Sequence, residues 1–197
     1  MQEKGVRDSL QIEDTNLAGV KILTPARHGD ARGFFSESWH KARMAEAGLD
    51  YDFVQDNHSM SAAVGTLRGL HYQAPPRAQA KLVRCGRGAL YDVAVDIRVG
   101  SPTYGQWIGV ELSFENGKQL MIPAGFLHGF VTRQPDTEIV YKCTDYYALD
   151  CDGAVRWDDP AIGIDWGLSG DPVLSGKDRE APLLSALGTV FDYEADT

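Results

Sequence analysis

Short apolar runs separated by turn-forming residues occupy most of this 197-residue chain. The runs are rich in Val, Ile, Leu and Tyr, and between them lie turns such as "GRG", "RVGSP" and "ENGKQ". Short β-branched segments bounded by turn residues are typical of strands. The pattern predicts strands over residues 19–25, 81–85, 89–97, 107–113, 119–124, 129–133 and 138–144. Strands at this spacing predict an all-β sandwich or a closed barrel.

Two other segments have a different character. Residues 38–49, "SWHKARMAEAGL", predict a helix that Ser38 caps and Gly48 ends. The tail from Trp157 onward is rich in Gly, Pro and Asp, and its two tryptophans indicate an ordered segment that wraps the barrel. Since the chain has an ordinary domain length and no internal repeat, we expect one domain over residues 1–197.

The charge of the chain limits its partners. A formal net charge of -9 and a sequence pI of about 4.9 create a field that repels polyanions, so nucleic acid is not expected as a partner. A small anionic ligand stays compatible with this charge, provided that Arg and Lys residues gather locally.

Cysteine use and hydropathy predict a cytoplasmic location. The number of cysteines is odd (Cys85, Cys143 and Cys151) and no Cys-x-x-Cys motif occurs, so we expect free thiols rather than disulfides. Residues 1–10 are too polar for a signal peptide, and no apolar run approaches the roughly 20 residues that a membrane span needs.

Two histidines raise the question of a metal. Small β-barrels of the cupin type often hold a metal with a His-x-His pair, a Glu and a later His. "PAGFLHGF" supplies a later His as His128, but His71 is followed by Tyr72 and Gln73, and the expected acidic residue is missing as well. Two imidazoles without a further ligand make a poor transition-metal site, so we expect no functional metal.

Charged and titratable residues gather around "LRGLHYQ". Arg68, His71 and Lys81 lie in the stretch 65–85, which otherwise reads as turn and strand, and His128 is a fourth such residue. One histidine alone is easily a satisfied core residue, but burying several such groups is costly unless they are paired or meet a ligand. The set therefore predicts a ligand cavity. Because Arg68 and His71 have opposite parity, both can face inward only if a bulge or turn occurs at Gly69.

Further polar residues in the strands leave alternatives open. Asp92 in "YDVAVDIR" can orient an imidazole by accepting its N–H, or it can face solvent. The stretch "VYKCTDYY" carries Tyr141, Tyr146 and Tyr147. Most strand tyrosines simply pack, but one that reaches a cavity can donate a proton and another can stack on a base.

Together and in this order, the motifs resemble the dTDP-4-dehydrorhamnose 3,5-epimerase family. The resemblance runs from about residue 16 to about residue 182 and rests on "GDARGFFSE", "FVQDNHS", "LRGLHYQ", "AKLVRC", "YDVAVDIRVGSPTYGQW", "IPAGFLHGF", "YKCTDYY", "RWDDPAIGIDW" and "LSGKD". It implies a cupin-like jelly roll (double-stranded β-helix) with a few short helices and terminal segments that wrap the core or pair with a partner. It also implies a homodimer that uses neither a metal nor a redox cofactor.

The substrate class implied by the resemblance is a dTDP-linked 4-keto-6-deoxyhexose. Its C4 ketone acidifies the hydrogens on C3 and C5, so epimerisation needs a base, a group that stabilises the enolate oxygen, and an acid on the opposite face. The resemblance makes His71 the base and Asp178 its carboxylate partner. It assigns Lys81 to the enolate oxygen and Tyr141 to the reprotonation.

Binding roles carry over in the same way. The resemblance places substrate contacts at Arg32, Glu37, Gln55, Asn57, Arg68, His128, Tyr147, Asp152 and Lys177. Tyr147 would stack on thymine, and Asp92 falls near His128. The chain departs from the family pattern at Asp152, where Glu is usual, and at Cys143, where Thr is frequent.

Three other functions remain open from the sequence. An epimerase that acts only at C3 or only at C5 would carry nearly the same residues. A cupin that binds a nucleotide sugar without turning it over is disfavoured, because a binder has no need of His71, Asp178 and Tyr141 together. A cupin dioxygenase is disfavoured by Gln73, which stands where a metal-binding histidine is needed.

Overall fold

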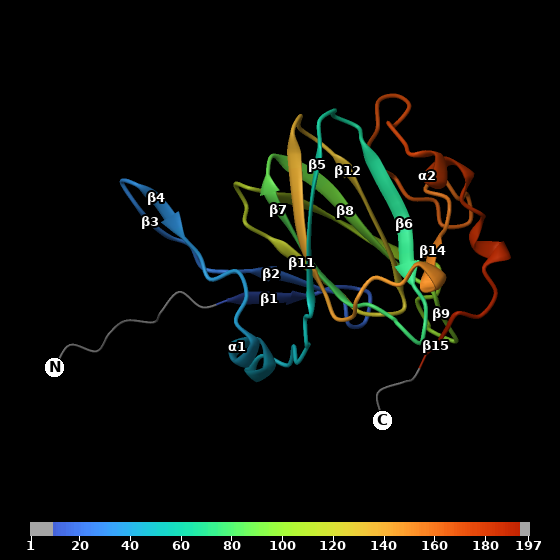
Figure 1. The fold of residues 1–197 in the computed structure, drawn as a ribbon, viewed down its shortest axis with the longest axis horizontal. Helices are drawn as coiled ribbons and strands as arrows, with labels where there is room; N and C mark the ends of the chain where they lie inside the picture. The colour runs from blue at the N-terminus through green and yellow to red at the C-terminus, as the bar shows by residue number, and fades with distance from the viewer. Residues whose placement is uncertain (1–9, 194–197) are drawn as a thin grey trace.

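Two antiparallel β-sheets face each other in the computed structural model, which describes residues 10–193 (Figure 1). The six-stranded sheet has the order β1 (Gln11–Asp14), β2 (Lys21–Thr24), β11 (Gln119–Ile122), β7 (Lys81–Arg87), β13 (Thr137–Cys143) and β5 (Gln55–Ser61). The five-stranded sheet has the order β10 (Trp107–Ser113), β8 (Ala89–Asp96), β12 (Phe126–Thr132), β6 (Leu67–Gln73) and β14 (Asp152–Ala154). The predicted all-β jelly roll is confirmed.

The remaining elements are short. They are the hairpin strands β3 (His28–Asp30) and β4 (Gly33–Phe35), the parallel pair β9 (Arg98–Val99) and β15 (Phe191–Asp192), the helices α1 (Lys41–Glu46) and α2 (Gly176–Glu180), and the single turns η1 (Leu149–Cys151) and η2 (Leu184–Ala186). Across residues 10–193, no helix has the length and apolar character needed to cross a membrane.

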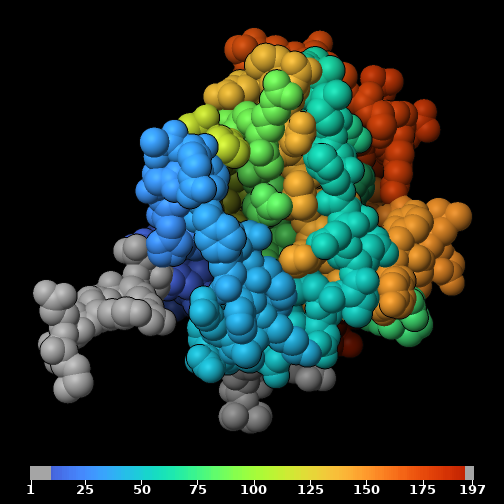
Figure 2. All heavy atoms as spheres, turned by 60° about the vertical axis from the view of Figure 1, so that its left-hand side comes forward, coloured from blue at the N-terminus to red at the C-terminus, as the bar shows by residue number. Residues whose placement is uncertain are grey.

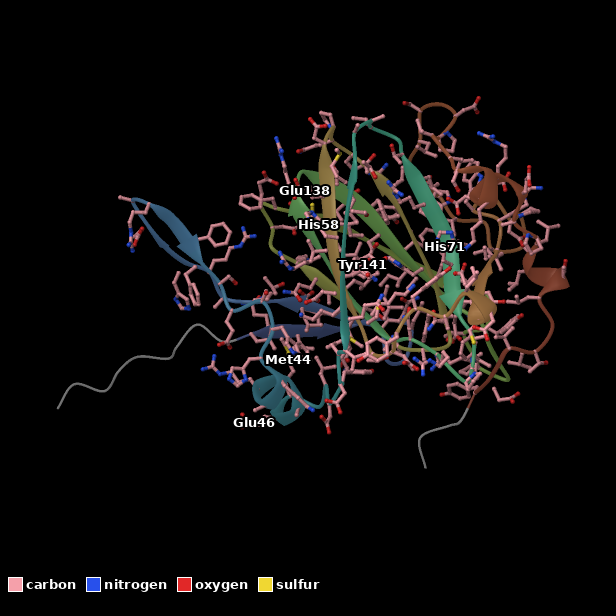
Figure 3. All side chains as sticks on the ribbon, in the orientation of Figure 1. Met44, Glu46, His58, His71, Glu138 and Tyr141 are labelled. Carbon is pink, nitrogen blue, oxygen red and sulfur yellow. The ribbon has the colours of Figure 1, made fainter. Side chains whose placement is uncertain are left out.

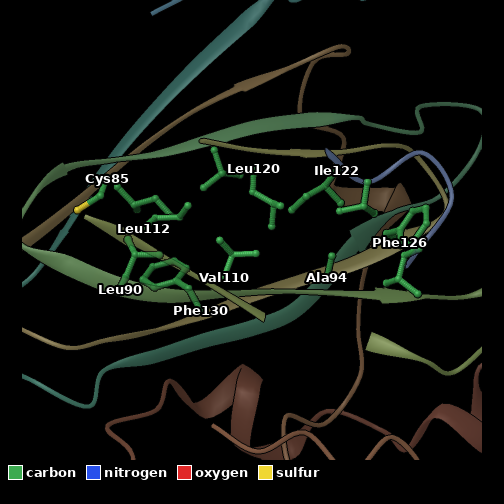
Figure 4. Close-up of a cluster of buried hydrophobic side chains, with 13 residues drawn as sticks. Cys85, Leu90, Ala94, Val110, Leu112, Leu120, Ile122, Phe126 and Phe130 are labelled. Carbon is green, nitrogen blue, oxygen red and sulfur yellow. The ribbon is translucent and has the colours of Figure 1, made fainter. Parts of the chain in front are cut away.

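The main core lies between the two sheets (Figure 4). Because side chains alternate along a strand, every second residue of β8, β10 and β12 points toward the facing sheet. Leu90 and Val110 come from one sheet, and Leu120 and Ile122 come from the other. Burial of these side chains stabilises the sandwich by roughly 1.5–3 kcal/mol each.

The outer face of each sheet is also covered. On the six-stranded sheet, Met44 of α1 and Leu49 pack against Leu82 and Met121. Figure 2 shows the blue segment that carries α1 lying along this flank of the molecule. On the five-stranded sheet, a second apolar cluster includes Trp166 from the C-terminal segment. The tail therefore wraps the barrel as predicted, which brings residues beyond 170 back to β6.

The predicted helix is shorter in the structure and begins at a different residue. The helix α1 spans Lys41–Glu46, and the Nδ1 atom of His40, not Ser38, accepts the capping bond from the Arg43 N–H at 3.4 Å. Ser38 is outside the helix, and its carbonyl accepts a bond from the Gln119 amide at 3.0 Å. The predicted end is correct, since Gly48 has a left-handed φ of 81°.

The hairpin formed by β3 and β4 stands away from the two sheets (Figure 1). Arg27 holds its base, with its guanidinium 4.3 Å from the centre of the Phe34 ring and bonded to the carbonyl oxygens of Phe114 and Glu115. Phe35 is 70% exposed on this hairpin.

Candidate active site

The imidazole of His71 and the carboxylate of Asp178 form a hydrogen-bonded pair. The distance from Nε2 of His71 to Oδ1 of Asp178 is 2.5 Å. Asp178 lies in α2, where the Ser175 hydroxyl donates to its other oxygen at 2.8 Å. The Asp178 side chain is only 4% exposed, whereas the His71 side chain is 31% exposed. Asp178 therefore holds the imidazole from a buried position, while the ring itself stays partly accessible.

The pKa of Asp178 lies below its usual range. Burial alone would raise this pKa, but the bond from His71, the Ser175 hydroxyl and the Gly69 N–H together outweigh burial. Asp178 therefore stays ionised, and a carboxylate beside an imidazole stabilises the imidazolium that forms when the ring takes a proton.

A bulge at Gly69 places His71 in this position. Gly69 has a φ of 116°, and the pairing of β6 with β12 shifts register between His128 and Phe130. A Cβ atom at Gly69 would lie 2.7 Å from the Cα atom of Gly129, so only glycine fits there. The predicted irregularity at this residue is confirmed.

His128 lies beside His71 on the neighbouring strand. The two residues are register partners in β12 and β6. Nε2 of His128 lies 2.7 Å from Oδ1 of Asp92, and both side chains are buried. The solvent-facing alternative for Asp92 is therefore wrong, since strand alternation puts it on the core face with Leu90 and Ala94. The other oxygen of Asp92 has no hydrogen-bond partner among the described residues.

The facing sheet contributes Lys81 and Tyr141. Lys81 is in register with Cys143, which is in register with Gln55, so these residues form a row across β7, β13 and β5. Burial lowers the pKa of Lys81, although the nearby Cys143 thiol and the carboxylates of Asp152 and Asp92 act in the opposite direction.

Tyr141 is the neighbouring polar group on β13. Burial raises the pKa of Tyr141, and a hydrogen bond with Asn57 opposes the increase. The Asn57 amide also donates to the Cys143 sulfur at 3.6 Å. Cys143 therefore packs inside the row as an acceptor for Asn57, which is a role that the frequent family Thr can also fill.

The two sheets enclose a cavity of about 220 Å³. It is lined by Gln55, Asn57, His71, Tyr72, Gln73, Gln79, Lys81, Tyr141, Tyr147, Asp152 and Lys177. Figure 3 shows His71 on β6 and Tyr141 on β13, on either side of the space between the sheets. A titratable group from each sheet therefore faces the same small volume.

Three predicted residues form the mouth of this cavity. Lys177 of α2 forms an ion pair with Asp152 of β14. The Tyr147 hydroxyl lies 3.5 Å from an Asp152 oxygen, and the Tyr147 N–H donates to the Gln55 amide oxygen at 3.0 Å. The Asp152 side chain, although shorter than the usual Glu, is long enough to reach Lys177.

Six other predicted residues are not part of the cavity lining: Asp178, His128 and Asp92, described above, and Arg68, Arg32 and Glu37. Arg68 bonds to Ser61 and to the Met60 carbonyl on β5, and its charge acts on the pKa of Tyr141. Arg32 is 90% exposed in the turn of the β3–β4 hairpin and pairs with Asp30. Glu37 pairs with Arg43 at 2.6 Å, next to α1.

The sequence-based assignment missed four residues around the site. Tyr72, Gln73 and Gln79 line the cavity, and Ser175 bonds to Asp178. The sequence did contain a pattern that marks Ser175: a Ser followed three residues later by an acidic residue, here Asp178, is typical of the start of a helix. No comparable signal marks the glutamines. Within residues 10–193, no three His, Cys, Asp or Glu side chains are grouped so that they could hold a metal ion.

Comparison with known proteins identifies the family. The family model of dTDP-4-dehydrorhamnose 3,5-epimerase matches residues 14–186. The dTDP-4-dehydrorhamnose 3,5-epimerase of Sinorhizobium fredii is 52% identical over 190 residues, which cover 94% of this chain and 95% of that protein.

Solved structures agree with this match. The dTDP-6-deoxy-D-glucose-3,5-epimerase of Legionella pneumophila, in complex with dTDP-4-keto-L-rhamnose, has a TM-score of 0.91 at 45% identity and covers 95% of this chain and 100% of its own. A 3'-monoepimerase from Streptomyces bikiniensis, in complex with dTDP-quinovose, has a TM-score of 0.86 at 36% identity and covers 91% and 92% of the two chains. The chain belongs to the dTDP-4-dehydrorhamnose 3,5-epimerase family of carbohydrate isomerases.

Proposed function

We propose that this chain epimerises dTDP-4-keto-6-deoxy-D-glucose at C3 and C5 to give dTDP-4-keto-L-rhamnose. The observation that carries the proposal is the placement of the His71–Asp178 pair and Tyr141 on opposite sides of one cavity. Inversion at a carbon needs a base on one face and an acid on the other, and this arrangement supplies both.

His71 removes the proton from C3 or C5 in this mechanism. The pair with ionised Asp178 fixes the ring and stabilises the imidazolium that forms. Nε2 of His71 is bonded to Asp178 while the side chain is 31% exposed and lines the cavity, so the sugar carbon approaches the ring from the cavity side. No change of oxidation state occurs, so the reaction requires no redox cofactor.

Lys81 and His128 stabilise the enolate oxygen at C4. Lys81 is half-buried in the cavity wall, and His128 lies beside His71 with Asp92 behind it. Donors fixed in a site of low dielectric stabilise a developing oxyanion far more than they would in water. Burial favours the neutral form of Lys81, and a negative oxygen that forms next to it restores the charged form.

Tyr141 returns the proton on the opposite face. Burial raises its pKa, so the phenol is protonated and available as an acid at neutral pH. The Asn57 amide fixes the hydroxyl. After transfer, the tyrosinate is the base that recovers a proton from solvent.

The nucleotide part of the substrate occupies the mouth of the cavity. Tyr147 stacks on thymine, while Lys177 and Arg68 supply positive charge for the diphosphate. Gln55 and Asn57 provide amide contacts, and Asp152 orients Lys177 through their ion pair.

A second copy of the chain completes the site. Arg32 and Glu37 lie on and next to a hairpin that stands away from their own cavity and exposes Phe34 and Phe35. An exposed apolar arm of this kind requires a partner surface, and in a symmetric dimer each arm reaches the other subunit. We therefore propose a homodimer of single-domain subunits in which each arm brings Arg32 and Glu37 to the partner's cavity.

The free thiols support a cytoplasmic location for this enzyme. Cys85, Cys143 and Cys151 are all buried and unpaired by disulfides. Thiols that stay reduced are typical of reducing compartments.

Proton NMR in D2O tests the proposed function. With dTDP-4-keto-6-deoxyglucose as substrate, the signals of the C3 and C5 hydrogens should both disappear while the product acquires the L-rhamno configuration. Loss of only one signal would indicate the monoepimerase alternative, which the similarity to the Streptomyces bikiniensis protein keeps relevant. Retention of both signals together with dTDP binding would identify a nucleotide-sugar-binding protein and contradict catalysis.

A further inference from the structure

Gln73 lies at the end of β6, two residues after His71, and its side chain is buried between two loops. We propose that Gln73 is a positioning residue for nucleotide binding, which acts by holding the loop that carries Tyr147. The inference rests on the proposed function, in which Tyr147 stacks on the base.

The Gln73 amide forms hydrogen bonds with backbone groups of two loops, the one that follows β6 and the one that carries Tyr147. Its oxygen accepts from the Ala148 N–H at 2.9 Å, and its nitrogen donates to the Tyr146 carbonyl at 3.0 Å. The same nitrogen donates to the Arg77 carbonyl. Gln73 therefore bonds to the residue before Tyr147 and to the residue after it, and it ties both to the loop that follows β6.

The Tyr147 ring has few contacts of its own. The residue is 57% exposed, and its hydroxyl lies 3.5 Å from Asp152, which is a weak contact. Its position is consequently set by its backbone, which Gln73 holds on both sides and Gln55 holds at the Tyr147 N–H. An aromatic ring binds a base well only if it is already oriented, because ordering it during binding reduces the affinity.

The bonds from Gln73 have no replacement if its amide is removed. An apolar residue at this position would leave the Ala148 N–H and the Tyr146 carbonyl unpaired near a buried side chain, and these groups would then move toward water. Besides the bond from the Tyr147 N–H to Gln55, the loop is held by Gln79 and Arg77, which both contact Asp145, two residues before the ring. They hold the start of the loop but do not fix Tyr147 itself.

This role also explains the residue type at position 73. In a His-x-His metal motif, position 73 would carry the second imidazole after His71. Here the side chain must donate two bonds and accept one, which a glutamine amide does and a neutral imidazole does not.

The test compares dTDP affinity in matched variants. Gln73→Met keeps an unbranched side chain of similar length but removes the amide. The control is Thr132→Val, which removes a buried hydroxyl that bonds to the Thr66 N–H and the Ala63 carbonyl at the opposite end of β12. Calorimetry should show a dTDP Kd about five- to tenfold higher for Gln73→Met and unchanged for Thr132→Val.

Turnover provides a second measurement. For Gln73→Met we expect KM to rise with Kd while kcat changes less than about twofold, because the Gln73 amide bonds to loop backbone groups and to none of the groups that react with the sugar. A fall in kcat equal to the loss of affinity would mean that Gln73 supports the reacting groups instead, and it would overturn the inference.

A double-mutant cycle with Tyr147→Ala separates the two proposals. If Gln73 acts through the ring, Gln73→Met should weaken binding in the wild-type background but have no further effect once Tyr147 is alanine. An equal effect in both backgrounds, or no effect in either, would overturn the inference. Failure of the wild-type protein to bind dTDP at all would instead overturn the proposed function.

Discussion

The carboxylate of Asp178 lies 2.5 Å from the imidazole of His71, although the two residues are 107 positions apart in the sequence. The bond forms because the C-terminal segment packs its apolar side chains on the outer face of the five-stranded sheet and returns α2 to β6. In the proposed mechanism, the stability of that packing is therefore also a condition for catalysis.

Replacement of His71 by alanine should remove nearly all turnover. Loss of a positioned general base lowers the rate by about 10²- to 10⁴-fold. The Kd for dTDP should stay close to that of wild type, because the proposed nucleotide contacts lie at the cavity mouth and not at His71. A variant that still epimerised at a near wild-type rate would show that another residue is the base.

Asp178→Asn should lower kcat by about 10²- to 10⁴-fold, because a neutral amide does not stabilise the imidazolium. Asp158→Asn is the matched control, since Asp158 pairs with Arg156 on the surface. Equal activities of the two variants would contradict the role of Asp178.

The same substitution should change acid stability. The pKa of Asp178 is lower in the folded protein than the value of about 3.9 in an unfolded chain. The stabilisation from its ionised form is therefore complete well above that value and is lost as the pH falls through the lower folded pKa. Urea unfolding at a series of pH values below about 5 should give a shallower loss of stability for Asp178→Asn than for wild type. Identical slopes would mean that the pKa of Asp178 is the same in the folded and the unfolded protein.

Tyr141→Phe should separate proton removal from inversion. The base remains, so deuterium should still enter the substrate in D2O, while formation of inverted product should fall by about 10²- to 10⁴-fold. Tyr146→Phe is the control, because Tyr146 is exposed and its side chain is not part of the cavity lining. Product formed by Tyr141→Phe at the control rate would exclude Tyr141 as the acid.

Lys81→Met should reduce kcat by about 10²- to 10³-fold, the usual cost of removing one donor from an oxyanion site. Lys142→Met serves as the control, since Lys142 lies on β13 and pairs with Asp56 on the outer face. The two variants are compared at saturating substrate, so that a change in affinity does not enter the ratio. Similar rates for both would contradict the role of Lys81 at the enolate.

Mixing two inactive variants tests the proposed exchange of arms. Arg32→Ala has an intact cavity but a defective β3–β4 arm. His71→Ala has an intact arm but a defective cavity. After joint refolding, activity should recover to about a quarter of wild type, because about half of the dimers are mixed and each contains one complete site. No recovery, in a sample shown by sedimentation to contain mixed dimers, would mean that each arm serves its own subunit.

Local sequence patterns predicted most of the apolar strands but missed others, including β5 and β6. The strand β5 reads "QDNHSMS", and its exposed residues alternate with half-buried polar ones at the edge of the sheet. Edge strands bury less apolar area, so their hydrophobic signal is weak. The start of α1 was also misplaced, because Ser38 is held by Gln119 from a distant strand.

The class of fold, the family and the types of chemical group available for the reaction can all be predicted from the amino-acid sequence. Strand periodicity and ordered motifs are local properties, so they can be read along the chain. Which of these groups contact one another follows from the three-dimensional fold. It placed Asp92 behind His128, brought Asp178 to His71, and separated Arg32 from the cavity of its own chain. These relations depend on sheet register and on packing between segments far apart in sequence, which no local pattern encodes.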